Sequence, residues 1–477
     1  MKRFLIVFFL LFSASGAFAQ EFSQYNTGTL YDSFENPSQK SFTPDTSRSY
    51  AFNFFVPNFD ANFTLTGDAQ QTLKNRYIND NYNNSALQIG SGNKYNNVNV
   101  NANAYSIMFK AFSSFDGDVE LGFFVDTKLD GRGAFTDESI ALLNGSANFP
   151  NNAYNNIFNS RYSYQLYNEV GATYREQVTK QLAFGLKVGL VSGMSAQNVH
   201  IDQSSITFDK AADSATLRLQ GTEQKAGFSK LPFSNPGIDV SIGTTYRTPD
   251  AFIIQTNLKN LGFIHWNKYA ETYDFSGETG IYDLTSAKRE TNVYDAVNDK
   301  VTGGKVIKGS YNTPLDGRFE LSGSKSFLLS DEETDLRYAP TLILSKELFY
   351  SGFTTALVSP IQYQNYSFTL VTSYEDKLFK LGTQFMVKSH NAEFFIASSQ
   401  LPQTADATAI ALKSHSQIDK TGAFTGADIS IGFSMKFGPV IEHPMNASHI
   451  PMGEEKGFLG RLWDKLFKPS DDKAMSE

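Results

Sequence analysis

A two-residue alternation between Tyr162 and Leu190 constrains the fold of this chain more than any other stretch. Even positions of the first arm are mostly apolar or aromatic and odd positions mostly polar, with Tyr167 and Asn168 as the exceptions. After a polar turn the alternation resumes from Leu182. Side chains leave a strand on alternate faces, so the pattern predicts a hairpin with one apolar face. Each arm exceeds the roughly five to six residues of soluble strands and suits a tilted bilayer crossing.

The same alternation recurs along most of the chain, down to a last strand at residues 428–437. Tight turns separate some strands, whereas the segments 67–97, 136–159, 285–313 and 401–425 are long and polar. Short turns on one side and long loops on the other are typical of outer-membrane barrels. The sequence therefore predicts an all-β fold, an antiparallel transmembrane β-barrel of about 14 strands spanning residues 50–438. The even face of the hairpin is expected to contact lipid.

The first nineteen residues have the pattern of a cleaved signal peptide. Lys2 and Arg3 precede a short apolar run, and Ala17-Phe18-Ala19 fits the small-x-small rule for cleavage before Gln20. A signal peptide together with a barrel predicts signal-dependent localisation to the outer membrane of a Gram-negative cell. Residues 20–49 form a polar lead-in with no periodicity.

Residues 439–477 are predicted to form a periplasmic tail with a short amphipathic helix. Two readings of this helix remain open: it packs on the barrel rim, or it binds the membrane surface or a protein partner. The apolar residues of its face are Phe458, Leu459, Leu462, Trp463, Leu466 and Phe467.

Composition excludes several functional classes. The chain has no cysteine, so disulfides and thiolate metal sites are excluded, and its net charge of −8 argues against nucleic acid as a partner. The six histidines are scattered, and no hydrolase, metalloprotease or nucleotide-binding motif is present. We therefore expect neither an enzyme, a metal site nor a cofactor.

The polar face of the alternation supplies the candidate lumen residues. These side chains either neutralise one another in a wet interior or line a path for a solute, because a barrel interior of this size must contain polar groups. The candidates are Glu169, Thr173, Arg175, Lys187, Asp239, Arg247, Asp428 and Lys436.

Three stretches resemble a known group of barrels. Asn36-Pro37-Ser38 resembles the Asn-Pro-Ala motif near the start of FadL-like outer-membrane barrels, with Ser38 in place of the alanine. The stretch from Asn257 to Phe263 resembles the Leu-Lys-Asn-Leu-Gly strand ending of Bacteroidota barrels in that superfamily. Those barrels include relatives of the PorV and PorP/SprF types, associated with type IX secretion and gliding. The lead-in itself, with residues 50–59, resembles an uncharacterised Bacteroidota family of the same group.

The resemblance implies that residues 20–49 form a plug inside the barrel, with Asn36, Pro37 and Ser38 as its motif, and that hydrophobic solutes pass laterally through the wall. Two functions are compatible with this resemblance. The first is FadL-like passive transport of a small solute, which can be hydrophobic, and the second is the role of a structural accessory barrel that transports nothing. The accessory barrel would bind periplasmic or secretion-machinery partners through its tail. Both functions place the protein in contact with outer-membrane lipid. A wall opening beside Asn36 would favour transport, and a filled barrel with a projecting tail helix would favour the accessory role.

Overall fold

A computed structural model gives the structure of the chain. It describes residues 27–41, 48–79, 82, 84–112, 118–228, 231–329, 336–350, 352–375, 378–389, 391–412, 426–440, 458–459 and 461. The predicted signal peptide lies outside the described residues. Among the helices that are described, none is long and apolar enough to cross a membrane.

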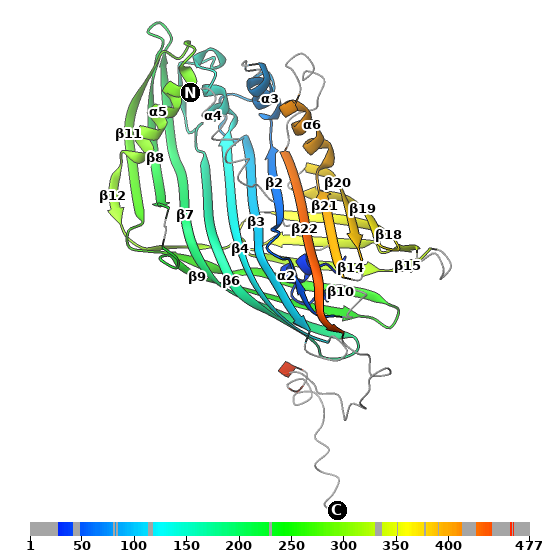
Figure 1. Ribbon diagram of the computed structural model, residues 1–477. Helices are drawn as coiled ribbons and strands as arrows, with labels where there is room; N and C mark the ends of the chain where they lie inside the picture. The colour runs from blue at the N-terminus through cyan, green and yellow to red at the C-terminus, as the bar shows by residue number, and fades with distance from the viewer. Residues whose placement is uncertain are drawn as a thin grey trace, which may run out of the picture.

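The strands close into a barrel of 14 antiparallel strands, as the sequence predicts (Figure 1). Closure occurs where β1 (Arg48–Phe52) and β2 (Asn58–Thr66), which follow one another along a single wall position, pair with the last strand, β22 (Gly426–Val440). On their other side β1 and β2 pair with β3 (Tyr95–Phe112). Closure leaves the first and last wall positions without a free sheet edge.

Some wall positions are occupied by one long strand and others by several short strands in line. The single strands are β3, β4 (Val119–Thr136), β6 (Arg161–Gln177), β7 (Leu182–Asp209), β18 (Phe353–Tyr363), β19 (Tyr366–Glu375), β20 (Leu378–Lys388), β21 (Ala392–Ser398) and β22. The composite positions are β1 with β2, β8 (Ser214–Ala226) with β9 (Pro236–Arg247), β10 (Phe252–Trp266) with β11 (Glu271–Tyr282), β12 (Lys305–Lys308) with β13 (Tyr311–Pro314), β14 (Arg318–Lys325) and β15 (Phe327–Leu328), and β16 (Leu336–Tyr338) with β17 (Thr341–Glu347).

The lower wall carries an exposed apolar belt. On β7, Leu186, Val188 and Leu190 point outward and are 40%, 38% and 57% exposed, while the residues between them are buried. Exposed aromatic residues flank the turns at the lower end, including Tyr246 and Phe252 around the β9–β10 turn. An apolar band bordered by aromatic residues is the lipid-facing surface of membrane barrels.

The upper end rises beyond this belt as a ribbon formed by β7, β8 and β11 (Figure 1). β7 has 28 residues, or about 90 Å of extended chain, far more than a hydrocarbon core of about 30 Å requires. Its upper outward residues, such as His200 and Asp202, are polar, as are Arg218 and Gln220 on β8. The ribbon therefore stands in water.

The ribbon has its own apolar core, because its inner face is covered by the helices and loops of the long connections (Figure 1). Ile206, Leu217 and Phe275 of the strands pack in one cluster with Leu142 and Val293. The connecting elements are α3 (Gln70–Asn79), α4 (Asp137–Leu142), the 3₁₀ turn η2 (Ser146–Asn148), β5 (Ala153–Asn155) and α5 (Arg289–Thr302), and α6 (Leu401–Leu412) lies above β20 and β22.

A short helix, α2 (Leu30–Glu35), lies inside the barrel (Figure 1). Thr29 caps its N-terminus by accepting a hydrogen bond from the backbone N–H of Asp32, and the Asp32 carboxylate accepts in return from the backbone of Thr29. Leu30, Tyr31 and Phe34 pack against inward aromatic side chains of the wall. Residues 27–41 therefore lie in the interior of the barrel and are called the plug from here on.

Candidate functional site

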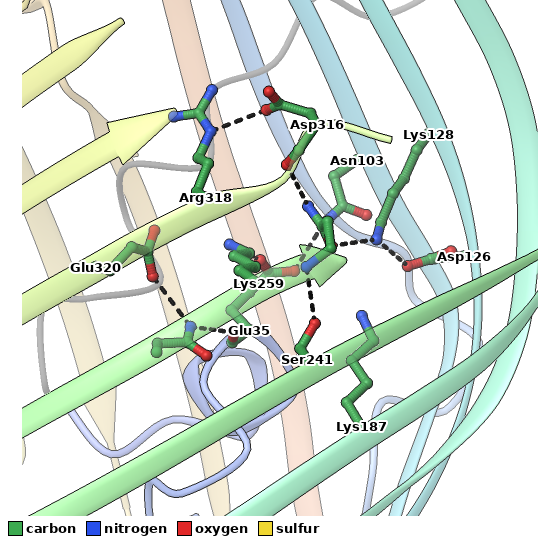
Figure 2. Close-up of polar contacts among 12 residues, drawn as sticks. Glu35, Asn103, Asp126, Lys128, Lys187, Ser241, Lys259, Asp316, Arg318 and Glu320 are labelled. Atoms are coloured by element: carbon green, nitrogen blue, oxygen red, sulfur yellow. Dashed lines mark hydrogen bonds and ion pairs between the residues drawn. The ribbon is translucent and has the colours of Figure 1, made fainter. Parts of the chain in front are cut away.

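The plug is fixed to the wall by one buried acid. The Glu35 carboxylate pairs with the Lys259 ammonium of β10 and accepts hydrogen bonds from Asn103 Nδ2 at 2.8 Å and Tyr105 Oη at 2.6 Å. Figure 2 shows Glu35, Lys259 and Asn103 converging in the interior. Glu35 and Lys259 are both almost fully buried. Because a charge buried without a partner is costly, this pair is an anchor for the plug.

A β-bulge explains how Lys259 reaches the plug. The register of β10 on β9 shifts between Leu258 and Leu261, and Asn260 has a positive φ of 53°. The additional residue places Lys259 and Asn260 side by side on the inner face, since both are buried while Leu258 is exposed. Asn260 accepts from Lys128 Nζ at 3.3 Å and donates to the Asp316 carbonyl at 3.3 Å. The Leu-Lys-Asn-Leu-Gly stretch thus forms the inner bulge that receives the plug.

The plug motif lies directly against two wall glycines. Asn36 Oδ1 accepts from the backbone N–H and the hydroxyl of Ser38, at 3.1 and 2.8 Å, which closes a tight turn. A Cβ on Gly185 would lie 2.1 Å from the Pro37 carbonyl carbon, and one on Gly243 would lie 2.5 Å from Asn36 Oδ1. Glycine leaves room for the plug backbone at position 185 and for the Asn36 and Ser38 side chains at position 243.

Most of the candidate lumen residues are buried inside the barrel. Arg175 Nε donates to the Ser38 carbonyl at 2.9 Å and so holds the plug from the β6 side. Lys187 donates to Tyr105 Oη at 3.0 Å. Asp428 accepts from Ser398 Oγ at 2.6 Å near the start of α6. Glu169, Thr173, Asp239 and Lys436 are buried as well, whereas Arg247, at the end of β9 beside the lower turn, is exposed.

Lys128 of β4 gathers three carboxylates at the centre of the interior. Its Nζ lies 2.8 Å from Glu169 Oε2, 3.7 Å from Asp126 Oδ2 and 3.8 Å from Asp239 Oδ2. Figure 2 shows Lys128 and Asp126 beside the plug anchor. Among the described residues no group of three or more acidic or histidine side chains has the geometry of a metal site. One ammonium group therefore faces three buried carboxylates in this part of the interior.

Above this cluster, Arg132 of β4 bridges to the opposite side of the barrel. Its guanidinium pairs with Asp316 Oδ1 and Glu347 Oε2, each at 2.5 Å, and lies 4.1 Å from the centre of the Tyr350 ring. Arg318 joins the same group through Asp316 at 2.9 Å. These contacts join β4 to the opposite wall across the described interior.

The wall itself is interrupted between β8 and β9. β9 pairs with β7 only as far as Ser192, and β8 begins to pair with β7 at Ala196. Among the described residues, none is a ladder partner of residues 193–195 of β7 on that side. The interruption is bordered by Asn235, whose Nδ2 donates to the Gly193 carbonyl at 3.0 Å and whose carbonyl accepts from the Gly193 N–H at 2.8 Å.

An apolar groove of about 370 Å³ lies on the outside of this interruption. Its floor includes the lipid-facing Val170 and Leu190, and its lip includes Leu231 and Phe233 of the segment between β8 and β9. Phe233 has a positive φ of 56° and its N–H donates to Ser192 Oγ at 2.8 Å. A non-glycine residue held in this conformation stores strain, a feature of ligand-binding segments. Asn36 is not among the residues lining the groove.

One feature of the sequence, the out-of-phase pair Tyr167 and Asn168, indicates the position of the groove. Tyr167 and Asn168 do not break the strand geometry: Tyr167 points inward and is buried, and Asn168 points outward and is exposed. Asn168 lines the groove and accepts from Thr127 Oγ1 at 2.8 Å on the outer face. Their reversed chemistry, polar outside and aromatic inside, marks the interrupted part of the wall. The lip at Leu231 and Phe233 had no periodic signal.

Little of the predicted tail helix falls within the described residues. Phe458 is exposed, and the Leu459 N–H donates to Glu176 Oε2 of β6 at 2.8 Å. Leu462, Trp463, Leu466 and Phe467 lie outside the described residues.

A closed antiparallel barrel with an apolar outer belt, an internal plug and water-exposed upper loops defines an integral membrane barrel. The chain belongs to the family of unknown function DUF5723, whose model matches residues 44–399. No curated protein matches it.

Similar solved structures include three membrane transport proteins or their homologues. The toluene transporter TbuX of Ralstonia pickettii is 11% identical, with 86% of this chain and 94% of that chain covered and a TM-score of 0.40. The P. putida toluene transporter TodX is 11% identical, with 86% and 94% covered and a TM-score of 0.37. A FadL homologue of Pseudomonas aeruginosa is 9% identical, with 86% and 94% covered and a TM-score of 0.37. Similarity at this level carries no information on function.

Proposed function

We propose that this protein resides in the outer membrane and passively transports a small hydrophobic solute, which leaves or joins the membrane through the interrupted wall at residues 193–195. The observation that carries the proposal is the apolar groove on the lipid side of that interruption, with Val170 and Leu190 as its floor. Apolar concave surfaces of a few hundred Å³ are the usual binding sites of small ligands.

The ion pairs of the interior favour a lateral rather than an axial path. The Glu35–Lys259 anchor and the Arg132 bridge lie inside the barrel, and loss of one partner of a buried ion pair costs about 3–5 kcal/mol. At residues 193–195 the described contacts toward β8 and β9 include the two hydrogen bonds between Gly193 and Asn235, which are neutral and therefore weaker than these ion pairs. It also lies at the upper limit of the lipid-facing belt, where β7 changes from outward apolar to outward polar residues.

The groove can be tested with a charge on its lip. Leu231 is 73% exposed, so Leu231→Asp should leave folding intact while placing a carboxylate beside the apolar floor. We expect uptake of the hydrophobic dye N-phenyl-1-naphthylamine by cells producing the protein to fall about tenfold, equivalent to about 1.4 kcal/mol.

Tyr282→Asp is the matched control, because Tyr282 is 68% exposed and lies on the water-exposed ribbon. Dye uptake is compared between cells that produce the unaltered protein, cells that produce Leu231→Asp and cells that produce neither. Equal uptake by all three would refute the transport proposal. Localisation is checked by membrane fractionation followed by heat-dependent gel mobility, in which a folded barrel migrates differently from the boiled chain. A soluble protein without heat-dependent mobility would refute the membrane assignment.

The accessory role remains a second proposal, supported by the plugged interior. In this role the barrel would hold a periplasmic or secretion-machinery partner through residues 454–477. Deleting that segment should then remove a specific protein from the set recovered with the barrel. An unchanged set, together with intact heat-dependent mobility, would contradict this role.

A further inference from the structure

We infer that Trp266 is the inner gate of the interrupted wall and limits the size of the solute that passes. This inference rests on the proposed lateral path. Trp266 is the last residue of β10, has no exposed surface and points into the barrel. It belongs to an apolar cluster with Tyr167, Val191 and Ile264 that lies behind the interruption.

The indole ring lies directly against Gly193, at the interruption of the β7 ladder. A Cβ built on Gly193 would be 2.7 Å from Trp266 Cζ3 and 2.8 Å from Ile264 Cγ2. Gly193 is also the residue at which the β9 ladder has ended and the β8 ladder has not begun. The groove therefore faces one side of this short backbone segment, and Trp266 covers the other.

The ring is held by a single hydrogen bond within the apolar cluster. Trp266 Nε1 donates to Thr313 Oγ1 at 2.9 Å, and Thr313 Oγ1 donates in turn to Gln165 Oε1 at 2.8 Å. A neutral hydrogen bond of this kind is much weaker than the ion pairs that fix the plug. Displacing the Trp266 ring would therefore break a neutral hydrogen bond and separate no charges.

A buried tryptophan is more often a packing residue than a gate, and packing alone would not affect size selectivity. The chain contains only two tryptophans, Trp266 and Trp463. In a Trp463→Phe background Trp266 is the sole tryptophan and its fluorescence reports directly on the gate. We expect bromobenzene, a contact quencher of indole, to quench this fluorescence saturably in the purified, folded protein. Linear, unsaturable quenching equal to that of free indole would overturn the inference.

Selectivity is the second measurement. Trp266→Phe should raise uptake of a bulky pyrene-based dye relative to N-phenyl-1-naphthylamine, and Trp266→Ala should raise the ratio further, by about tenfold. Phe208→Ala is the matched control, because Phe208 is equally buried but lies in the core of the water-exposed ribbon. Trp266→Phe retains an aromatic ring and should fold even where Trp266→Ala does not.

The inference would be overturned if folded Trp266→Phe left the uptake ratio of the two dyes unchanged. It would also be overturned if Phe208→Ala changed that ratio equally. The two measurements separate this inference from the transport proposal. Saturable quenching without uptake of either dye would refute transport while keeping Trp266 as a solute contact. Uptake of both dyes with a ratio that does not change in the Trp266 variants would support the transport proposal and refute the gate.

Discussion

Removing the Lys259 ammonium should release the plug. In Lys259→Met the Glu35 carboxylate remains fully buried and keeps only the neutral donors Asn103 and Tyr105. Loss of one partner of a buried ion pair costs about 3–5 kcal/mol. At about 1.4 kcal/mol per factor of ten, the ratio of docked to undocked plug should fall by roughly two to three and a half orders of magnitude.

The absence of native cysteine makes the undocked state measurable. Ser33 of α2 has no exposed surface, so a Ser33→Cys thiol should react with a maleimide only when the plug leaves its site. The labelling rate should rise strongly in Lys259→Met. It should return to its original low value in the double variant Glu35→Gln with Lys259→Met, because both members of the former ion pair are then neutral. Lys308→Met is the control, since Lys308 pairs with Glu271 at 3.7 Å on the exposed surface. Equal labelling with and without Lys259 would refute the anchor.

Two further predictions concern the belt and the upper loops. Leu186→Arg places a charge in the lipid-facing belt, so it should cost about 2–4 kcal/mol and block membrane assembly, measured by heat-dependent mobility. Burial raises the pKa of Glu290, but hydrogen bonds from Arg76 and Tyr82 outweigh burial, and its pKa lies below the ordinary value. A lowered carboxyl pKa stabilises the folded state above the unfolded pKa of about 4.3, and that contribution is lost as pH falls through the folded pKa. The Arg76–Glu290 pair joins α3 to α5, so spin labels on these two helices should move apart in acid but not at neutral pH. In Arg76→Ala the labels should be apart at both pH values. A distance between the labels that does not change with pH in the protein with Arg76 would contradict this role of the pair.

The sequence predicts the wall well and the interior poorly. The β6–β7 hairpin can be recognised because one face of the belt contacts lipid and must be apolar. The upper part of β7 is harder to recognise, because the ribbon is polar outside and the phase of β7 shifts at a bulge between Ile201 and Gln203. The Glu35–Lys259 pair joins residues far apart in the sequence, and it depends on a bulge that alternation alone does not locate. Interior contacts of this kind depend on the exact strand register, and a pattern with a period of two does not distinguish registers that differ by two residues.

The plug anchor also has a consequence for how related sequences should vary. The segment shared with the family, residues 44–399, contains Lys259 but not Glu35. A relative that retains a plug of this kind should exchange the acid and the base together, because either one alone is a buried unpaired charge. A relative without the plug should carry a neutral residue at the position of Lys259. A single alignment column in the wall would then reveal, from sequence alone, whether a member of the family closes its barrel from within.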